Sequence, residues 1–271
     1  MLVPSFPRRR DPWQAYTGVV SLRIERRERL AVLRLDKPRG NAIDEELAEA
    51  LGRAAAELAG DGAVQGVLLA SAHPKLFCPG LDLFALADYD RSAMERFMRL
   101  FTQAVLSLYG LSKPMVAAVG GAAVAGGCIL ALTSDHRVLK RGAVIGLNEV
   151  KVGVPLPWAV TALLRASVPA PALARVALLG RNFSDEEAVS VGLADELRPA
   201  EGFEESCLSR LQEFAEKDAF ALRTTKAWLR EPTLREMRAH EDEHLARFLD
   251  GWFSPATQQR IRAALSVLQK R

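Results

Sequence analysis

VAGGCIL, residues 124–130, is an apolar stretch that contains two adjacent glycines. In a helix interior, each glycine costs about 0.5–1 kcal/mol of stability relative to alanine. A glycine has no side chain, however, so its backbone NH can approach a ligand closely. The strand-like run MVAAVGG (115–121) precedes this stretch and helical spacing follows it, which predicts Gly126 and Gly127 at a helix N-terminus. The first NH groups of a helix have no partner within it, and they attract negative charge.

Outward from this stretch, strands alternate with helices. A hairpin is predicted at residues 19–36, where apolar and polar residues alternate on both sides of the charged turn ERRER. Regularly spaced leucines predict a helix that begins at residue 43, with Gly60 just past its end. The remaining predictions are buried strands at 64–71 and 113–121, a helix at 91–110, apolar segments at 136–140 and 143–147, and helices through most of the chain after Glu201. This alternation predicts the α/β fold class.

A second glycine-containing turn lies in LFCPGLDLFAL, residues 76–86, directly after the predicted strand at 64–71. Gly80 leaves the backbone bare there, so the NH of Leu81 can face a cleft. Two such turns after neighbouring strands aim two NH donors at one oxygen atom. They predict an oxyanion hole with one NH from each turn, which stabilises an enolate by about 2.7–4 kcal/mol per donor. Close packing at the turns is the alternative explanation for these glycines.

The composition of the chain excludes several classes of protein. With 271 residues and 49% hydrophobic content, the chain can bury a large core. The basic residues are scattered and the net charge is only +3, so no nucleic-acid partner is expected. No apolar run reaches the roughly 18 residues of a membrane span, so no membrane partner is expected. Three cysteines without a CxxC pair argue against disulfides and a metal site, and favour a reducing, cytoplasmic location.

Five motifs resemble, in order, those of the crotonase, or enoyl-CoA hydratase/isomerase, superfamily: FCPGLDL, AAVAGGC, SDHRV, IGLNEVKVGVP and GLADE. The resemblance covers residues 18–271. It implies an α/β, crotonase-type spiral of ββα units with a C-terminal helical region, a role in fatty acid metabolism, and assembly as a homotrimer or a dimer of trimers. The implied substrates are acyl-CoA thioesters. No cofactor is implied, because coenzyme A is part of the substrate.

The chain is expected to divide into three parts. Its terminal position and composition predict that residues 1–17 form a disordered N-terminal arm without a secretory signal, with an organellar leader or a packing arm as the alternatives. Residues 18–200 are predicted to form the spiral core. Residues 201–271 are predicted to form helices that serve oligomerisation and close the pocket.

Several residues match functional positions of the superfamily. The NH groups of Leu81 and Gly126 match its oxyanion hole, and Glu149 matches its catalytic glutamate. Apolar neighbours of Glu149, namely Ile145, Leu147, Val150 and Val152, predict partial desolvation and a raised pKa, which suit a general base. Substrate contacts are implied for six residues: Ala42, Lys75, Cys78, Gly80, Leu81 and Gly126.

One position separates the reactions of the superfamily. Its hydratases carry a second glutamate three residues after the oxyanion glycine, where this chain has Ile129. A double-bond shift needs only one base, so the chain resembles the Δ3-Δ2-enoyl-CoA isomerase branch, with Glu149 as that base. Open alternatives are a hydratase acting through Glu149 alone, a thioester hydrolase, lyase or decarboxylase, and a non-catalytic acyl-CoA-binding protein. The chain has no GxSxG motif of a serine nucleophile.

A few other polar and aromatic residues have two possible roles. His73 and Lys75 either contact the CoA diphosphate and adenine or belong to an exposed loop. Asp82 and Asp135 are expected to cap helices or turns rather than to act as acids. Four aromatic residues of the C-terminal region are expected in the core or at subunit contacts: Trp228, Phe248, Trp252 and Phe253.

Overall fold

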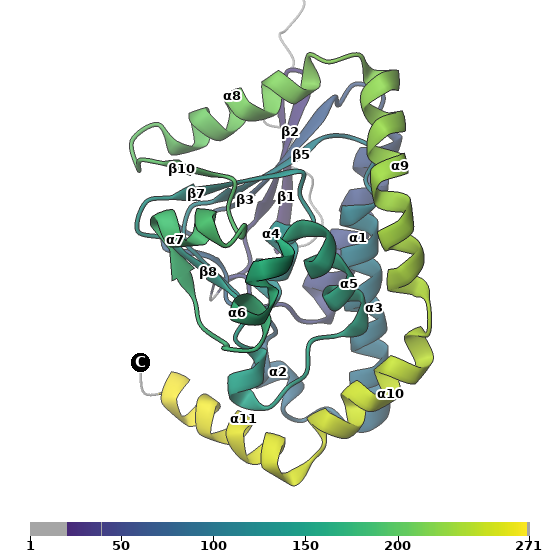
Figure 1. The fold of residues 1–271 in the computed structure, drawn as a ribbon, viewed down its shortest axis with the longest axis vertical. Helices are drawn as coiled ribbons and strands as arrows, with labels where there is room; N and C mark the ends of the chain where they lie inside the picture. The colour runs from purple at the N-terminus through teal and green to yellow at the C-terminus, as the bar shows by residue number, and fades with distance from the viewer. Residues whose placement is uncertain (1–20, 39, 270–271) are drawn as a thin grey trace, which may run out of the picture.

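The computed structural model describes residues 21–38 and 40–269 (Figure 1). The arm predicted at residues 1–17 lies outside the described residues. Among the described helices, none is long and apolar enough to cross a membrane.

Two sheets form the centre of the fold. The larger sheet has the strand order β1-β2-β3-β5-β7-β10, in which β1 and β2 are antiparallel and the other neighbours are parallel. The smaller sheet has the order β4-β6-β8-β9, in which β4, β6 and β8 are parallel. The strands are β1 (Leu22–Arg27), β2 (Leu30–Leu35), β3 (Gly66–Ser71), β4 (Leu76–Cys78), β5 (Met115–Val119), β6 (Ala122–Val124), β7 (His136–Lys140), β8 (Val144–Gly146), β9 (Phe183–Ser184) and β10 (Glu196–Arg198).

The chain builds both sheets through a repeated ββα unit. Strands β3, β5 and β7 each extend the larger sheet, and β4, β6 and β8, which follow them, each extend the smaller sheet. Helices follow each pair of strands: α2 (Leu83–Leu86) and α3 (Arg91–Tyr109), then α4 (Gly126–Leu132), then the 3-10 helix η1 (Glu149–Val152) and α5 (Trp158–Ser167). Each unit lies beside the previous one in both sheets, so the chain winds as the predicted α/β spiral of ββα units.

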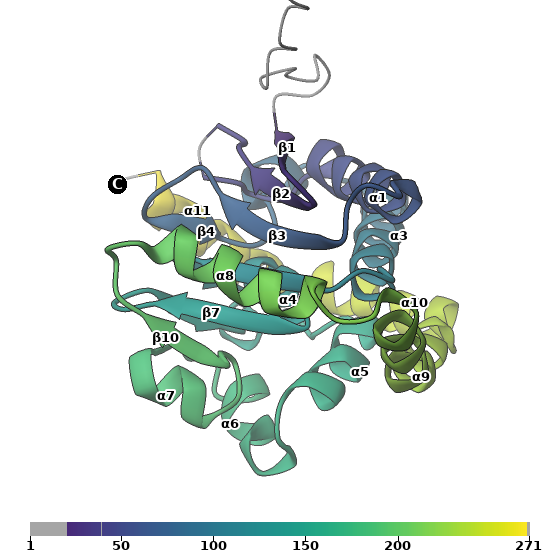
Figure 2. The same cartoon turned by 90° about the horizontal axis from the view of Figure 1, so that it is seen from above.

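Both faces of the larger sheet are buried. Leu33 and Leu69 face the main core with α1 (Glu45–Gly60) and α3, whereas the neighbouring Leu68 faces α8 (Phe203–Ala215). Figure 2 shows α8 lying over the strands of this sheet. Burial on both faces explains why the strands β3 and β5 read as continuous apolar runs rather than as alternating ones.

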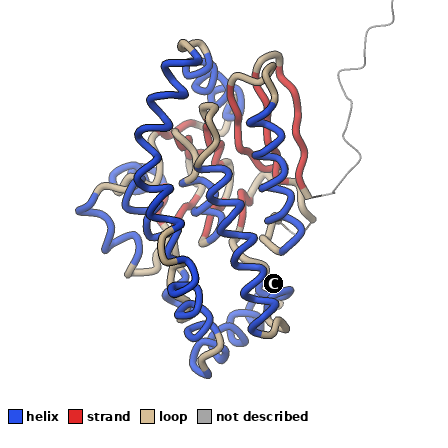
Figure 3. The backbone as a smooth tube through the Cα atoms, turned by 90° about the vertical axis from the view of Figure 1, so that its right-hand side faces the viewer, coloured by secondary structure: helices blue, strands red, loops and turns tan. Residues whose placement is uncertain are grey.

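The last helices run around the outside of the spiral. Helices α9 (Ala219–Arg238) and α10 (Glu241–Trp252) follow each other along one side, and α11 (Pro255–Leu268) crosses below (Figure 1). From the α9 side, helices lie in front of the central strands, and further strands remain in view at one side (Figure 3). Helix α10 packs against α3 and α5, and α11 contacts η1. Two of the aromatic residues expected in the core, Phe248 and Trp252, are buried there.

Some elements of the fold were not predicted. Strands β4 and β6 have three residues each, which is too short for an alternating pattern to be recognised. The pattern also left out α5, η2 (Ala170–Ala172), α6 (Leu173–Ala177) and α7 (Asp185–Ser190). Gly60 was expected beyond α1 but is its last residue, because the NH of Asp61 closes the helix on the Glu57 oxygen at 3.1 Å.

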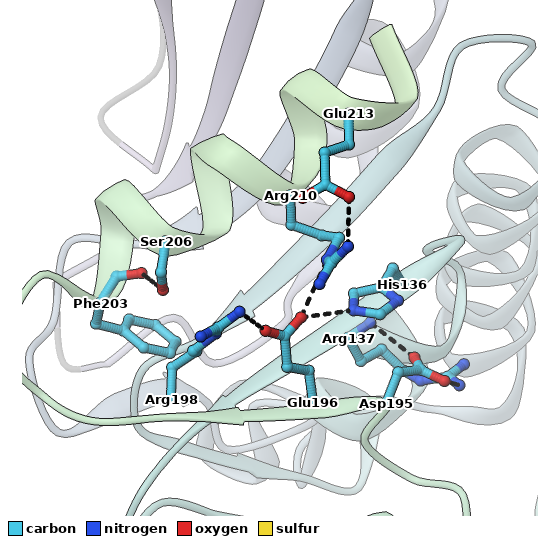
Figure 4. Close-up of polar contacts among 9 residues, drawn as sticks. All are labelled: His136, Arg137, Asp195, Glu196, Arg198, Phe203, Ser206, Arg210 and Glu213. Atoms are coloured by element: carbon cyan, nitrogen blue, oxygen red, sulfur yellow. Dashed lines mark hydrogen bonds and ion pairs between the residues drawn. The ribbon is translucent and has the colours of Figure 1, made fainter. Parts of the chain in front are cut away.

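A charged cluster attaches α8 and β10 to β7 (Figure 4). Arg137 on β7 donates to Asp195 at 2.8 Å, and Glu196 on β10 lies 3.2 Å from the His136 ring and accepts from Arg210 of α8 at 3.1 Å. Burial acts to raise the pKa of Glu196, but the hydrogen bonds from Arg210 and His136 hold it below its usual range. The cluster therefore joins β7 to β10 and α8, which lie more than 50 residues further along the chain.

Candidate active site

Three of the predicted motifs meet at one edge of the smaller sheet. Gly80 comes two residues after β4, Gly126 two residues after β6, and Glu149 three residues after β8. These strands are parallel neighbours, so their carboxyl ends share one edge, where neighbouring strands lie about 4.8 Å apart. The sequence had placed the glycine turns directly after β3 and β5, which was wrong, because β4 and β6 intervene.

The backbone around Leu81 presents its NH away from the neighbouring segment. Ile43 forms a parallel bridge with Leu81, through hydrogen bonds from Ile43 NH to Gly80 O and from Asp82 NH to Ile43 O, both 2.8 Å. Successive residues of an extended chain point to opposite sides, so the Leu81 NH points away from Ile43. Among the backbone hydrogen bonds of turns, loops and caps in residues 21–38 and 40–269, none is donated by this NH. Gly80, with φ +103°, makes the turn that allows this arrangement.

The second donor, the Gly126 NH, lies next to the first turn. Gly126 is the first residue of α4, where an NH has no acceptor within the helix. A Cβ placed on Gly80 would lie only 3.1 Å from this nitrogen, so the two turns are in contact. Ala125 adopts φ +50°, a rare conformation for a residue with a side chain, costing about 1–3 kcal/mol. Its NH is held by the Gly146 oxygen at 2.8 Å, which ties the turn to β8.

At position 127, glycine is required by close packing rather than by the approach of a ligand. A Cβ at this position would lie 2.0 Å from the carbonyl oxygen of Cys78, at the end of β4. The alternative explanation of close packing therefore holds for Gly127, whereas Gly126 combines close packing with an NH at the first position of α4, where the helix supplies no acceptor.

Gly127→Ala is expected to lower the free energy of unfolding by more than about 2 kcal/mol, because the new methyl group overlaps rigid backbone. Gly52→Ala in α1 is the matched control, since no atom lies within 4 Å of its added Cβ. That control is expected to gain about 0.5–1 kcal/mol. Urea unfolding followed by circular dichroism measures both variants. Equal stability of the two would contradict the packing explanation.

Glu149 begins η1 and carries a carboxylate without a full set of partners. Its Oε2 atom is inaccessible to solvent, and among the described residues it has no hydrogen-bond partner. Burial raises the pKa of Glu149 to about 7, while the NH groups of Glu149 and Asn148 act in the opposite direction. The expected desolvation is therefore present; Ile145 and Leu147 of the predicted apolar neighbours are buried, whereas Val150 is 38% exposed.

The helix that begins at Gly126 brings no second acid. Ile129 is buried in α4, and all seven residues of this helix are apolar or small. Cys128, on the same helix, has a raised pKa because it is buried and because Glu149 is near. This proximity places Glu149 beside α4. At the position of α4 where hydratases of the superfamily carry a second glutamate, this chain has Ile129.

The remaining predicted contact residues lie in different places. Cys78 is fully buried, its thiol donates to the Asn41 oxygen at 3.1 Å, and burial raises its pKa to about 12. This thiol is therefore no nucleophile. The Ala42 oxygen accepts from Lys37 at 3.1 Å, one residue before the bridge to Leu81. Lys75 is exposed at the amino end of β4, so it is not brought to the edge that holds Gly80.

The two aspartates have separate structural roles. Asp82 caps α2 by accepting from Phe84 NH and Ala85 NH, as predicted. Asp135 caps neither a helix nor a turn, so the capping part of that prediction was wrong. It accepts from Met115 NH at 2.7 Å and pairs with Lys226 and Arg230 of α9, each at 2.6 Å. It therefore fixes α9 to the core.

Asn41 lies directly behind the two turns and was not among the predicted site residues. It is fully buried, with φ +66°. The dipeptide Gly40-Asn41, typical of a turn, was the only signal available in the sequence.

Comparison with known proteins agrees with this arrangement. Residues 25–254 match the enoyl-CoA hydratase/isomerase family. The chain is 28% identical over 243 residues to human "enoyl-CoA delta isomerase 1, mitochondrial", covering 89% of this chain and 80% of that protein. It is 33% identical over 231 residues to a "putative enoyl-CoA hydratase" of Thermus thermophilus, covering 82% of this chain and 88% of that protein.

The fold is similar to that of a solved structure as well. The crystal structure of human mitochondrial Δ3-Δ2-enoyl-CoA isomerase matches with a TM-score of 0.89 and 27% sequence identity, covering 92% of this chain and 98% of that one. The ββα spiral, the two bare turns and the family match over most of the chain agree, and this chain is an enzyme of the enoyl-CoA hydratase/isomerase family.

Proposed function

We propose that this enzyme shifts the double bond of a 3-enoyl-CoA to give the 2-enoyl-CoA. The observation that carries the proposal is the buried Oε2 of Glu149, which has no hydrogen-bond partner in the described part of the chain and lies at the same sheet edge as the NH groups of Leu81 and Gly126. Helix α4 adds no second carboxylate to hold a water molecule. A single base beside an oxyanion hole suits proton transfer better than addition of water.

In the proposed mechanism, the thioester oxygen lies between the NH groups of Leu81 and Gly126. The Glu149 carboxylate takes a proton from Cα, and the electron pair of that C–H bond moves into a dienolate whose negative oxygen the two NH groups stabilise. The protonated Glu149 then delivers the same proton to Cγ, and the double bond comes to lie between Cα and Cβ. No atom is gained or lost, and the only coenzyme is the CoA of the substrate.

The proposed substrate contacts extend away from these three groups. Ala42, Cys78 and Gly80 line the turns through their backbone, because the Cys78 side chain is buried. Lys75 is proposed to meet the CoA diphosphate, and its exposure at the amino end of β4 leaves its charge available. His73 has its Nε2 atom 2.9 Å from the Lys37 oxygen, which favours a role in the loop over a role in binding.

The rate of isomerisation is expected to depend on pH through Glu149. The carboxylate must be unprotonated to accept the Cα proton, and its pKa is about 7. We therefore expect kcat/KM to fall by about tenfold per pH unit below pH 7 and to level off above it. A profile between about pH 5.5 and 8.5 measures this, with the residual activity of Glu149→Gln as the control. A flat profile in the parent enzyme would count against Glu149 as the base.

The reaction itself is tested by supplying 3-enoyl-CoA and 2-enoyl-CoA separately and identifying the products by mass and retention time. An isomer of unchanged mass from 3-enoyl-CoA supports the proposal. A hydrated adduct formed mainly from 2-enoyl-CoA selects the hydratase reaction, after which the Thermus thermophilus relative is named. Free CoA selects thioester hydrolysis, and no product selects a binding protein.

Three exposed, large apolar side chains on α9 support a proposed homotrimer or dimer of trimers. Phe220, Trp228 and Leu229 are 72%, 72% and 74% exposed on this helix. In many oligomers, exposed large apolar side chains are covered by a partner subunit. Light scattering at micromolar concentration is expected to give three or six times the chain mass of 29.6 kDa. A single-chain mass would contradict this expectation.

We also propose a cytoplasmic location, which the three free, buried cysteines suit.

A further inference from the structure

Asn41 is a buried residue that forms hydrogen bonds to three separate segments of the chain. Its Oδ1 accepts from the Lys37 NH at 2.8 Å, and its Nδ2 donates to Ser71 Oγ and to the Phe77 carbonyl oxygen, both at 2.9 Å. Its own carbonyl oxygen accepts from the Cys78 thiol at 3.1 Å. A buried amide is costly unless its polar atoms are paired, and here each side-chain atom has a partner.

These bonds join the two segments that place the first oxyanion donor. Phe77 and Cys78 are the last residues of β4, from which the chain turns at Gly80 to Leu81. Asn41 also lies two residues before Ile43, which forms the parallel bridge to Leu81. This bridge directs the Leu81 NH away from Ile43. Asn41 therefore fixes the separation of both segments, and with it the direction of this NH.

The same segment also touches the second donor. The Cδ1 atom of Ile43 lies 2.9 Å from the position of a Cβ on Gly126, so Ile43 packs against both turns. A shift of residues 41–43 would move the two turns relative to each other. A displacement of about 1 Å at a reacting centre lowers a rate by as much as 10²-fold.

We propose that Asn41 is a positioning residue, whose side-chain amide holds the Leu81 NH in the geometry that stabilises the dienolate oxygen. This inference rests on the proposed function. It differs from a role in stability alone, because it requires that loss of the amide weakens polarisation of a bound thioester even in a folded protein.

Three variants separate the possibilities. Asn41→Gly keeps the ability to adopt φ +66° but removes the three side-chain hydrogen bonds. Ser71→Ala removes one acceptor of the amide and leaves Asn41 in place. Leu68→Ala is the control for lost stability, because this fully buried side chain packs on the opposite face of the larger sheet, against α8.

The test compares turnover with the state of the bound carbonyl group. Each variant is saturated with hexanoyl-CoA labelled with ¹³C at the thioester carbon, and infrared difference spectra give the frequency of its carbonyl stretch. Hydrogen bonding to the oxygen lowers this frequency. The kcat for 3-enoyl-CoA is measured in parallel, and urea unfolding gives the stability of each variant.

We expect the parent to lower the carbonyl frequency and Asn41→Gly to lose most of that shift, with kcat reduced by about 10–100-fold. Ser71→Ala is expected to reduce the carbonyl shift and kcat as well, but by less. If Asn41→Gly does not fold, this variant tests the positioning role of Asn41. Leu68→Ala is expected to keep the full shift and at least half of the parental kcat.

The failures are distinguishable. A parental shift and kcat in folded Asn41→Gly, or an unchanged Ser71→Ala where the glycine variant does not fold, would overturn the role of Asn41 alone. Equal losses in Leu68→Ala would do the same, because they would assign the effect to stability. A parent enzyme that leaves the carbonyl frequency of hexanoyl-CoA unchanged would overturn the proposed oxyanion hole, and the inference with it.

Discussion

Glu149→Gln is expected to lower the rate of isomerisation of 3-enoyl-CoA by about 10²–10⁴-fold, equivalent to roughly 3–5 kcal/mol of barrier. The amide has almost the volume of the acid but cannot accept the Cα proton at neutral pH. Because one carboxylate is proposed to make both transfers, its loss affects removal and delivery of the proton together. Single-turnover and steady-state assays with the same 3-enoyl-CoA measure the effect.

The fold is expected to survive this substitution. The Oε2 atom of Glu149 has no hydrogen-bond partner among the described residues, so the amide breaks no contact of that atom. Glu46→Gln, at an exposed position of α1, is the control and is expected to keep the parental rate. Parental activity in Glu149→Gln would remove Glu149 from the mechanism. A parent enzyme that hydrates 2-enoyl-CoA faster than it isomerises 3-enoyl-CoA would reject the single-base isomerase.

Gly126→Val is expected to lower kcat/KM by at least about 10²-fold, the loss typical of removing one oxyanion donor. The Cβ of the new side chain would lie 2.9 Å from Ile43 Cδ1 and 3.2 Å from the Gly80 Cα. The Ile43 side chain can move, but the Gly80 backbone cannot do so without moving the turn to Leu81. The substitution therefore displaces both NH donors.

A matched control separates this effect from the cost of a valine in general. Gly62→Val adds the same side chain in an exposed loop, where no atom lies within 4 Å of the new Cβ, and is expected to retain parental kcat/KM. Circular dichroism and thermal unfolding establish which variants are folded at the assay temperature. A folded Gly126→Val with more than half of the parental kcat/KM would show that this turn does not contribute to the reaction.

The sequence alone determined the class of fold and most of its long elements. Continuous apolar runs predicted β3 and β5, and helical spacing with acidic first turns predicted α1, because these signals arise within one element and need no distant partner. The same local reasoning placed Gly126 at the start of α4, where the structure has it. It also anticipated that apolar neighbours would raise the pKa of Glu149.

Only the tertiary structure decided how the site is assembled. Strands β4 and β6 are too short to be recognised in the sequence, yet their pairing with β8 brings Gly80, Gly126 and Glu149 to one edge. The importance of Asn41 depends on Ser71 and Phe77, which are 30 and 36 residues away in the chain. Hydrogen bonds of this kind leave no periodic pattern in a sequence, because they are set by how complete strands and turns lie against each other.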